Sequence, residues 1–191
     1  MKKLYAAALI AGLVMTAFAL TGCSAAKYRI KEVKSEKSTN TYDYYEGGAL
    51  KSIITTDEEG EETFRREFSE DGKLTKVESS AQYYPAMTII GDLAYTRYDT
   101  QVGLEYDSDF YLRPDGQTKM KVQRYEDKTV TNIFIYDENG VCKGITTDQA
   151  GDEYFRLTYE YDYDSNGNPS KCYQVMDGEK TFVNDMIYEK Y

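Results

Sequence analysis

A short turn motif recurs along most of this chain and constrains its fold more than any other feature. Each copy joins an aromatic residue or leucine to acidic residues and a glycine. The five copies are Tyr45-Glu46-Gly47-Gly48, Phe68-Ser69-Glu70-Asp71-Gly72, Leu112-Arg113-Pro114-Asp115-Gly116, Tyr136-Asp137-Glu138-Asn139-Gly140 and Tyr163-Asp164-Ser165-Asn166-Gly167. Asn-Gly and Asp-Gly pairs favour tight hairpin turns, because such turns need positive φ. The motif therefore predicts a series of β-hairpins.

The spacing of the motif sets the size of the repeating unit. Its final glycines lie 24, 44, 24 and 27 residues apart, and the step of 44 is close to two units. Secondary turns are expected between the copies, at Glu59-Gly60, Ala150-Gly151-Asp152 and Asp177-Gly178. Each unit then holds two strands, which gives a meander of about ten to twelve strands.

Residues 154–164 show the clearest strand pattern. One face carries Phe155, Leu157, Tyr159, Tyr161 and Tyr163, and the other carries Arg156, Thr158, Glu160, Asp162 and Asp164. This alternation is typical of an antiparallel strand with one solvent-facing side. We predict an all-β fold, an antiparallel meander of hairpins after a helical signal peptide. The sheet could be a curled open sheet, a barrel or a sandwich, and we favour a barrel-like form. The apolar stretch from Ala86 to Ile90 is expected to be a central strand.

The hairpin units resemble the YD repeats of Rhs-type bacterial surface and secreted proteins, whose unit is roughly Tyr-Asp-x-x-Gly-x-Leu. The matching residues are Tyr136-Asp137 with Gly140, Tyr163-Asp164 with Gly167, and Phe68 with Asp71-Gly72-Lys73-Leu74. The resemblance spans residues 45–190 and implies the hairpin architecture. It does not imply that the chain encloses a toxin, because five or six hairpins are too few to build a shell.

The N-terminus has the features of an export signal. Lys2 and Lys3 precede an uncharged, mostly apolar stretch of 17 residues, 4–20. This pattern is typical of a secretory signal peptide, with a retained anchor helix as the alternative. Leu20-Thr21-Gly22-Cys23 resembles the bacterial lipobox. The resemblance implies cleavage before Cys23 and acylation of its thiol, which would anchor the protein by lipid, palmitate included, on the extracytoplasmic face of the cell membrane.

Three segments follow from these observations. Residues 1–22 are assigned to the signal peptide, 23–40 to the acylated cysteine and a flexible basic stalk, and 41–191 to a single β domain. The stretch 24–40 carries five basic and two acidic residues, net +3, and is too polar to bury a core. Its charge suits anionic headgroups, or simply a solvated linker. Residues 41–191 carry 16 basic and 31 acidic residues, net −15.

Composition excludes several classes of function. The chain contains no histidine, so Ser-His-Asp and Cys-His hydrolases and His-ligated zinc enzymes are ruled out. A formal net charge of −10 argues against a nucleic-acid partner, which would need a basic surface.

Three groups of residues could form chemical sites, namely a cysteine pair, an EF-hand-like segment and acidic pairs. For each of them a purely structural role explains the residues better. Cys142 and Cys172 could form a disulfide, but both follow equivalent turns with one strand between them. Two strand spacings are about 9.5 Å, beyond the limit of about 7 Å for bridged Cα atoms. The segment 162–168 matches the start of an EF-hand loop, but Tyr173 occupies the position of its bidentate glutamate.

Acidic pairs such as Asp107 with Asp109, or Glu61 with Glu62, could act as paired carboxylates. Nothing in the sequence places two of them in one cleft. We therefore predict no catalytic residues, no metal site and no cofactor.

Tyrosine is the residue type that leaves function open. The chain has 20 tyrosines, and they suit both half-buried strands and binding surfaces. Tyr159, Tyr161 and Tyr163 are the candidate binding residues. We expect a non-enzymatic module on the cell surface that binds an envelope protein or a glycan. The alternatives are a carrier with a small ligand or lipid inside a barrel, and a structural envelope component.

Overall fold

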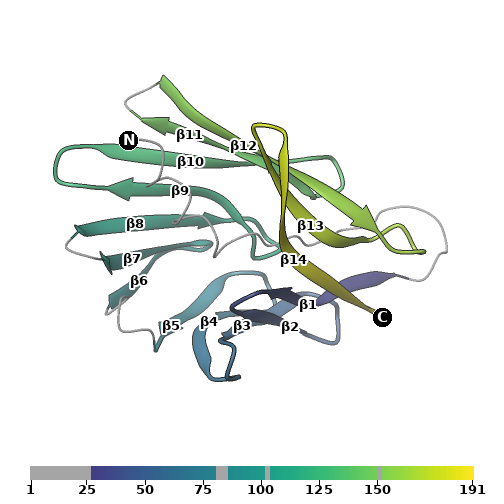
Figure 1. The fold of residues 1–191 in the computed structure, drawn as a ribbon. Helices are drawn as coiled ribbons and strands as arrows, with labels where there is room; N and C mark the ends of the chain where they lie inside the picture. The colour runs from purple at the N-terminus through teal and green to yellow at the C-terminus, as the bar shows by residue number, and fades with distance from the viewer. Residues whose placement is uncertain (1–26, 81–85, 102–103, 150–151) are drawn as a thin grey trace.

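The fold is entirely β over the described part of the chain. The computed structural model describes residues 27–80, 86–101, 104–149 and 152–191 (Figure 1). Its strands are β1 (Tyr28–Ser35), β2 (Thr39–Tyr44), β3 (Leu50–Thr56), β4 (Glu62–Phe68), β5 (Leu74–Ser79), β6 (Ala86–Gly91), β7 (Ala94–Gln101), β8 (Leu104–Leu112), β9 (Thr118–Arg124), β10 (Thr129–Tyr136), β11 (Cys142–Gln149), β12 (Asp152–Tyr163), β13 (Pro169–Met176) and β14 (Glu179–Lys190).

The all-β prediction is therefore confirmed. In the four described ranges no helix has the length and apolar character needed to cross a membrane. The predicted signal peptide and Cys23 lie outside these ranges. The sheet has 14 strands rather than the predicted ten to twelve, partly because the segment assigned to the stalk adds β1 and the start of β2.

The strands form one antiparallel meander that curls into a nearly closed barrel. Its order is β5-β4-β3-β2-β1-β14-β13-β12-β11-β10-β9-β8-β7-β6. The first and last strands of the described chain, β1 and β14, pair from Tyr28 opposite Lys190 to Ser35 opposite Asn184. The edge strands β5 and β6 lie beside each other (Figure 1). The backbone N–H of Leu74 donates to the Asp92 carbonyl, 2.6 Å away, and joins the two edges at one end.

All five copies of the sequence motif make the same bulged turn. The final glycine of each copy has φ between 77° and 86°, and its N–H donates to the carbonyl three residues earlier. One strand of each hairpin then carries an extra residue, which shifts the register beside the turn. This geometry is a turn followed by a glycine bulge, for which positive φ is required. The hairpin turns predicted from the motif are confirmed.

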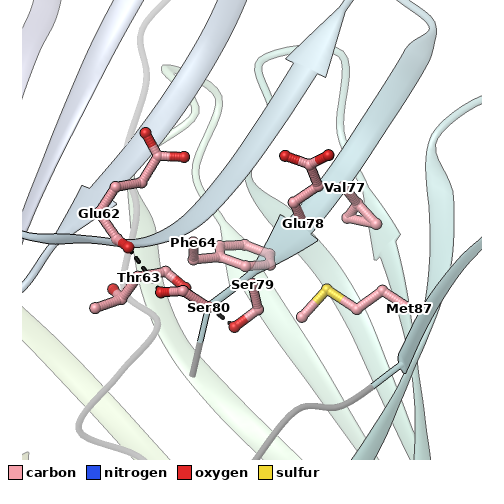
Figure 2. Close-up of a pocket in the computed structure, with 8 residues that line it drawn as sticks. All are labelled: Glu62, Thr63, Phe64, Val77, Glu78, Ser79, Ser80 and Met87. Atoms are coloured by element: carbon pink, nitrogen blue, oxygen red, sulfur yellow. Dashed lines mark hydrogen bonds between the residues drawn. The ribbon is translucent and has the colours of Figure 1, made fainter. Parts of the chain in front are cut away.

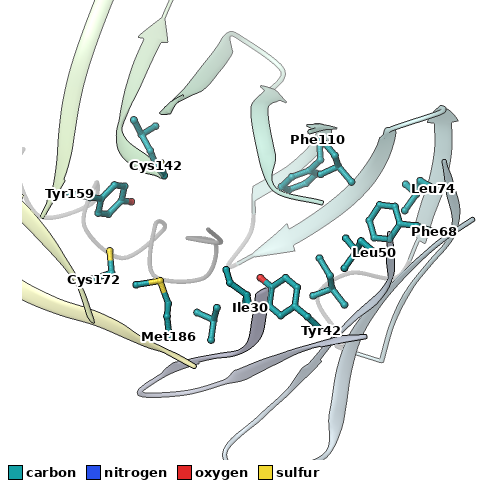
Figure 3. Packing of buried hydrophobic residues seen from close by; sticks show 14 of the residues in the cluster. Ile30, Tyr42, Leu50, Phe68, Leu74, Phe110, Cys142, Tyr159, Cys172 and Met186 are labelled. Carbon is teal, nitrogen blue, oxygen red and sulfur yellow. The ribbon is translucent and has the colours of Figure 1, made fainter. Parts of the chain in front are cut away.

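Side chains from all round the barrel fill its interior (Figure 3). The β8–β9 turn packs into this core, because a Cβ placed on Gly116 would lie 2.6 Å from Leu50 Cδ2 and 2.8 Å from Ile53 Cδ1. The Gly116 carbonyl accepts a 3.0 Å hydrogen bond from Nη1 of the buried Arg66. The turn therefore connects the β3–β4 wall to the opposite β8–β9 wall through the interior.

The prediction of a flexible stalk is wrong for residues 28–35 and 39–40, which belong to β1 and β2. Ile30 and Val33 of β1 point into the core and are only 1% and 3% exposed. A bulge between Ile30 and Glu32 separates these two inward residues by three positions instead of two. The usual alternation of a strand is therefore absent from the sequence, and the exposed Lys31 and Lys34 beside them gave the segment the appearance of a linker.

The prediction that Ala86–Ile90 forms a central strand is also wrong. These residues belong to β6, which is an edge of the sheet. Ile89 and Ile90 are 37% and 47% exposed. A mostly apolar run normally indicates burial on both faces, but here it lies where the barrel is left open.

Candidate functional site

The structure does not bring the three predicted binding tyrosines onto one accessible face. Tyr159 is buried, and Tyr161 lies on the same inner side, where its hydroxyl donates a 2.5 Å hydrogen bond to the Cys142 carbonyl. Tyr163 is 53% exposed. It is the last residue of β12, directly before the 164–167 turn, so its side chain lies at the end of the strand rather than in the core.

Half-buried tyrosines instead hold neighbouring strands together. The hydroxyls of Tyr44 and Tyr136 donate to the carbonyls of Ile30 and Thr118, at 2.8 and 2.6 Å. Each bond joins the end of one strand to the start of the strand before it, as Tyr161 does. Burial raises the pKa of all three hydroxyls, which keeps them protonated and able to donate. Part of the high tyrosine content is thus a structural requirement.

The two cysteines of the barrel are free and buried. Cys142 lies in β11 and Cys172 in β13, with β12 between them. Burial raises the pKa of the Cys142 thiol to about 11 and that of Cys172 to about 12. Both are therefore neutral thiols that pack in the core near Tyr159 (Figure 3).

The EF-hand-like segment is occupied by turn interactions. Asp164 Oδ1 accepts hydrogen bonds from the backbone N–H groups of Asn166 and Asn168, at 2.8 and 2.9 Å. Asp162 Oδ2 instead accepts a 2.8 Å bond from the Tyr173 hydroxyl. Across the described residues, no group of three or more potential metal ligands is gathered at one point.

A concave feature lies at the seam, which we define as the gap between the edges of β5 and β6. Although these strands are neighbours in the chain, no ladder pairs them within the described ranges. A groove of about 470 Å³ opens there (Figure 2). We call it the seam groove, and its lining residues are Glu62, Thr63, Phe64, Val77, Glu78, Ser79, Ser80 and Met87.

The seam groove has an apolar floor and a polar rim. Phe64 and Val77 are half-buried at the margin of the core, and Met87 faces them from β6. The rim serines are already engaged with β4, because the hydroxyls of Ser79 and Ser80 donate to the carbonyls of Thr63 and Glu62. The floor is therefore the part of the groove where apolar side chains remain partly exposed to solvent.

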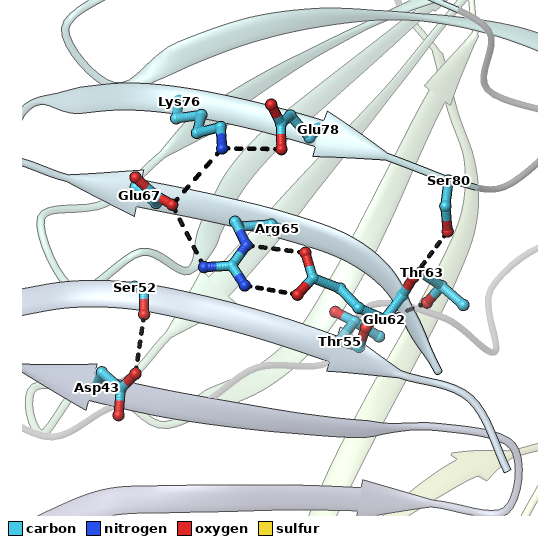
Figure 4. A network of polar contacts seen from close by, with 10 residues as sticks. All are labelled: Asp43, Ser52, Thr55, Glu62, Thr63, Arg65, Glu67, Lys76, Glu78 and Ser80. Carbon is cyan, nitrogen blue, oxygen red and sulfur yellow. Dashed lines mark hydrogen bonds and ion pairs between the residues drawn. The ribbon is translucent and has the colours of Figure 1, made fainter. Parts of the chain in front are cut away.

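A network of ion pairs runs along the outer face of β4 and β5 beside the groove (Figure 4). Arg65 binds both Glu62, at 2.5 Å, and Glu67, at 3.3 Å. Lys76 lies 2.9 Å from Glu78 and 3.9 Å from Glu67. The hydrogen bond from Arg65 holds the pKa of Glu62 below its ordinary value. Three carboxylates face two cations, so the network keeps one net negative charge.

Apart from Glu62, sequence analysis missed the groove residues, although one signal pointed towards them. The apolar stretch that includes Met87 was noticed, but its apolar character was attributed to a buried central strand. The contribution of Phe64 and Val77 depends on where the sheet fails to close, which is a property of the whole barrel rather than of any one segment.

Comparisons with known proteins give no functional assignment. No protein-family model matches the sequence, and no curated protein matches it. Among solved structures, a porin-like protein from Bacteroides uniformis is similar with a TM-score of 0.38 and 11% sequence identity, over 86% of this chain and 96% of that one.

Proposed function

We propose that the protein is a lipid-anchored surface lipoprotein that acts as a non-enzymatic binding module, with the seam groove as its binding surface. The observation that carries the proposal is the open seam itself. Exposed strand edges can template pairing with other chains, and proteins usually protect them. Here two edges face each other beside exposed apolar side chains, which is a surface suited to a partner.

The anchor is supported by the sequence around Cys23 and by the position of β1. Four residues, 24–27, separate Cys23 from the first strand, and a chain of that length spans at most about 14 Å. An acylated Cys23 would therefore hold the barrel next to the membrane. The basic residues Lys27, Arg29 and Lys31 would then lie near anionic headgroups.

The alternative function, a carrier with its ligand inside the barrel, has less support. Core side chains from both walls meet in the interior, and the Gly116 turn packs between Leu50 and Ile53. A ligand of any size would have to displace this turn and the Arg66 hydrogen bond that holds it. The outer surface and the seam are the more accessible places for recognition.

The proposal can be tested with the soluble segment 27–191, which contains all the described strands. We would use it to capture partners from detergent-solubilised envelope of the native host. A single stoichiometric partner, lost with Met87→Asp but kept with the outer-face control Thr88→Asp, is the expected result. Empty captures from envelope and cell-wall fractions would contradict a binding module.

The anchor needs a separate measurement. Cells expressing the full chain and fed labelled palmitate should incorporate the label, and Cys23→Ala should abolish it. Incorporation that survives Cys23→Ala would contradict the proposed anchor without affecting the binding proposal.

A further inference from the structure

The two ends of the barrel differ in how much apolar surface they expose. We infer that the end where β1 begins and β14 ends places its exposed apolar side chains in the interface of the bilayer that holds the acylated Cys23. We call it the anchor end, and the opposite one the far end. The inference rests on the proposed lipid anchor and specifies how the barrel is oriented on the membrane.

The topology gathers the start of β1, the end of β14 and all five motif turns at the anchor end. Neighbouring strands are antiparallel, so every odd-numbered strand begins there and every even-numbered strand ends there (Figure 1). The backbone N–H of Tyr191 donates to the Lys27 carbonyl, 3.0 Å away, which holds the end of β14 beside the start of β1. Since residues 24–27 span at most about 14 Å, the lipid on Cys23 would lie within that reach of the anchor end.

Exposed apolar side chains are concentrated at the anchor end. Nine large apolar side chains are exposed among the described residues, and seven of them lie within three residues of the point where an even-numbered strand ends. Two of the seven are in β6, two are in β10, and the others are Tyr163, Ile187 and Tyr191. Three residues of a strand cover about 10 Å, and interfacial apolar surfaces enter a bilayer by about 5 to 10 Å.

The far end has fewer such side chains. Met176 and Phe182 are the other two, and they lie beside the β13–β14 turn. The seam groove also opens towards the far end, because its lining comes from the start of β4, the end of β5 and the start of β6. A barrel that rests on its anchor end would therefore present the groove to a partner outside the membrane.

The exposed side chains at the anchor end suit both layers of an interface. Ile133 and Ile135 of β10 are 45% and 42% exposed, and they point outwards because Phe134 between them packs against the core. They can contact hydrocarbon. Tyr163 and Tyr191 are more than half exposed, and tyrosine suits the headgroup level because its ring is apolar and its hydroxyl is polar.

Charge decides which lipids the anchor end should prefer. Cations partly neutralise the carboxylates of its turns, since Lys143 Nζ lies 3.3 Å from Asp137 Oδ2 and Arg113 Nε lies 3.0 Å from Asp115 Oδ2. Residues 41–191 nevertheless carry a net charge of −15, so anionic headgroups should repel most of the barrel. The attraction must therefore come from apolar contact, for which a neutral bilayer is sufficient.

Radical footprinting tests the orientation. The 27–191 segment with an N-terminal hexahistidine tag would be tethered to phosphatidylcholine vesicles that contain a nickel-chelating lipid. Oxidation of Tyr163 and Tyr191 by hydroxyl radicals should fall about five-fold relative to the untethered segment, whereas that of Met176 and Phe182 should change by less than about two-fold. The full acylated chain, reconstituted in phosphatidylcholine, should give the same pattern.

Variants test whether apolar contact carries the docking. Sedimentation of the untagged 27–191 segment with phosphatidylcholine vesicles measures its partition coefficient. Ile133→Ser combined with Ile135→Ser should lower this coefficient about ten-fold, because two half-exposed isoleucines no longer contact lipid. The matched control, Met176→Ser combined with Phe182→Ser, removes similarly exposed side chains from the far end and should change it by less than about two-fold. Circular dichroism checks that each variant keeps the barrel intact.

Three results would overturn the inference. These are unchanged oxidation of Tyr163 and Tyr191 on vesicles, equal losses from the two double variants, and binding that requires an anionic lipid such as phosphatidylglycerol. Two further results would replace the lipid with another occupant. Protection of the same tyrosines in native envelope but not on vesicles would identify a protein, and their protection in a lipid-free dimer would identify a second copy.

The hexahistidine tether separates this inference from the proposed anchor, because it works whether or not the cell acylates Cys23. Failure of palmitate labelling would reject the anchor. Unprotected tyrosines on the tethered protein would reject only the docking of the barrel, and the lipid on Cys23 would then hold a barrel that does not touch the membrane.

Discussion

The barrel closes in two places, and the two closures are built differently. At the joint, where β1 meets β14, strands from opposite ends of the described chain pair along their length. At the seam, β5 and β6 follow each other in the chain, yet the described residues join them by one backbone bond at one end and by no ladder. Closeness in sequence therefore does not decide which edges of this sheet are sealed.

Side chains explain the difference. At the joint, Val33 and Met186 are paired across the strands and both are buried. Arg29 lies 2.7 Å from Glu189 and its guanidinium lies over the rings of Tyr44 and Tyr191.

At the closed end of the seam the corresponding contact is weak. Lys73 and Asp92 form an exposed ion pair at 3.8 Å. A sealed edge thus needs inward apolar pairs and a ladder, and exposed charges alone contribute little.

The largest expected effect comes from removing the joint. A chain that starts at residue 37 lacks β1, which leaves β2 and β14 as two additional open edges and removes Ile30 and Val33 from the core. We expect it to lose cooperative thermal unfolding and near-UV circular dichroism, whereas the 27–191 chain should show both. Cooperative unfolding of the shortened chain within a few degrees of the longer one would show that the joint is dispensable.

The joint is also where sequence analysis failed, for an identifiable physical reason. Hairpin turns were predictable because positive φ favours glycine, and each motif glycine has positive φ and marks a turn. Strand β1 was not predictable, because its bulge hides the alternation of Ile30 and Val33. No local pattern indicates that this strand pairs with β14, since that pairing depends on how the whole meander curls.

The second prediction concerns the turn that links the seam side of the barrel to the opposite wall. Gly116→Ala forces a Cβ against Leu50 and Ile53 at positive φ. Left-handed strain and overpacking together should cost about 3 kcal/mol of unfolding free energy. Gly72, in the β4–β5 turn, also has positive φ, but a Cβ added there would meet open space. Gly72→Ala should therefore cost about 1 kcal/mol of unfolding free energy, from the left-handed backbone alone. Urea denaturation of both variants measures the difference, and equal losses would show that the turn does not pack tightly.

The third prediction compares apolar side chains at the two closures. Met186→Ala should destabilise the barrel by about 2 to 3 kcal/mol, because Met186 is buried opposite Val33. Ile89→Ala should cost a few tenths of a kcal/mol, about what a partly exposed surface position contributes. Thermal denaturation of the two variants gives the comparison directly. A loss at Ile89 as large as that at Met186 would mean that the seam is closed in solution.

The candidate site was less predictable than the fold. The sequence shows that Ala86–Ile90 is apolar, but it does not show that β6 lies at an edge. The alternation around Tyr159 indicates a strand, but it does not show which face of that strand is inside the barrel. The exposure of Tyr163 depends on its place at the end of β12, which the alternation does not show. Residues that line a gap between strands are identified only once the positions of those strands are known.

The smallest expected effect concerns the Arg65–Glu62 ion pair at the charged rim of the seam. Removing this pair tests whether the rim contributes to the stability of the barrel. Arg65 donates hydrogen bonds to Glu62 and holds its pKa below the ordinary value. A lowered carboxyl pKa stabilises the folded state at a pH above the unfolded pKa, and this stabilisation is lost as the pH falls through the folded pKa. Glu62→Gln should therefore cost a few tenths of a kcal/mol at neutral pH, about the value of an exposed ion pair, and nothing in strong acid.

The control for this pH dependence is Glu59→Gln, at the tip of the β3–β4 turn, whose carboxylate forms no ion pair with the described residues. Urea titrations of both variants at neutral and acidic pH separate the pair from a general loss of charge. If Glu59→Gln shows the same pH dependence, the Arg65–Glu62 pair adds nothing specific. Recognition at the seam would then depend on its backbone edges and apolar floor alone.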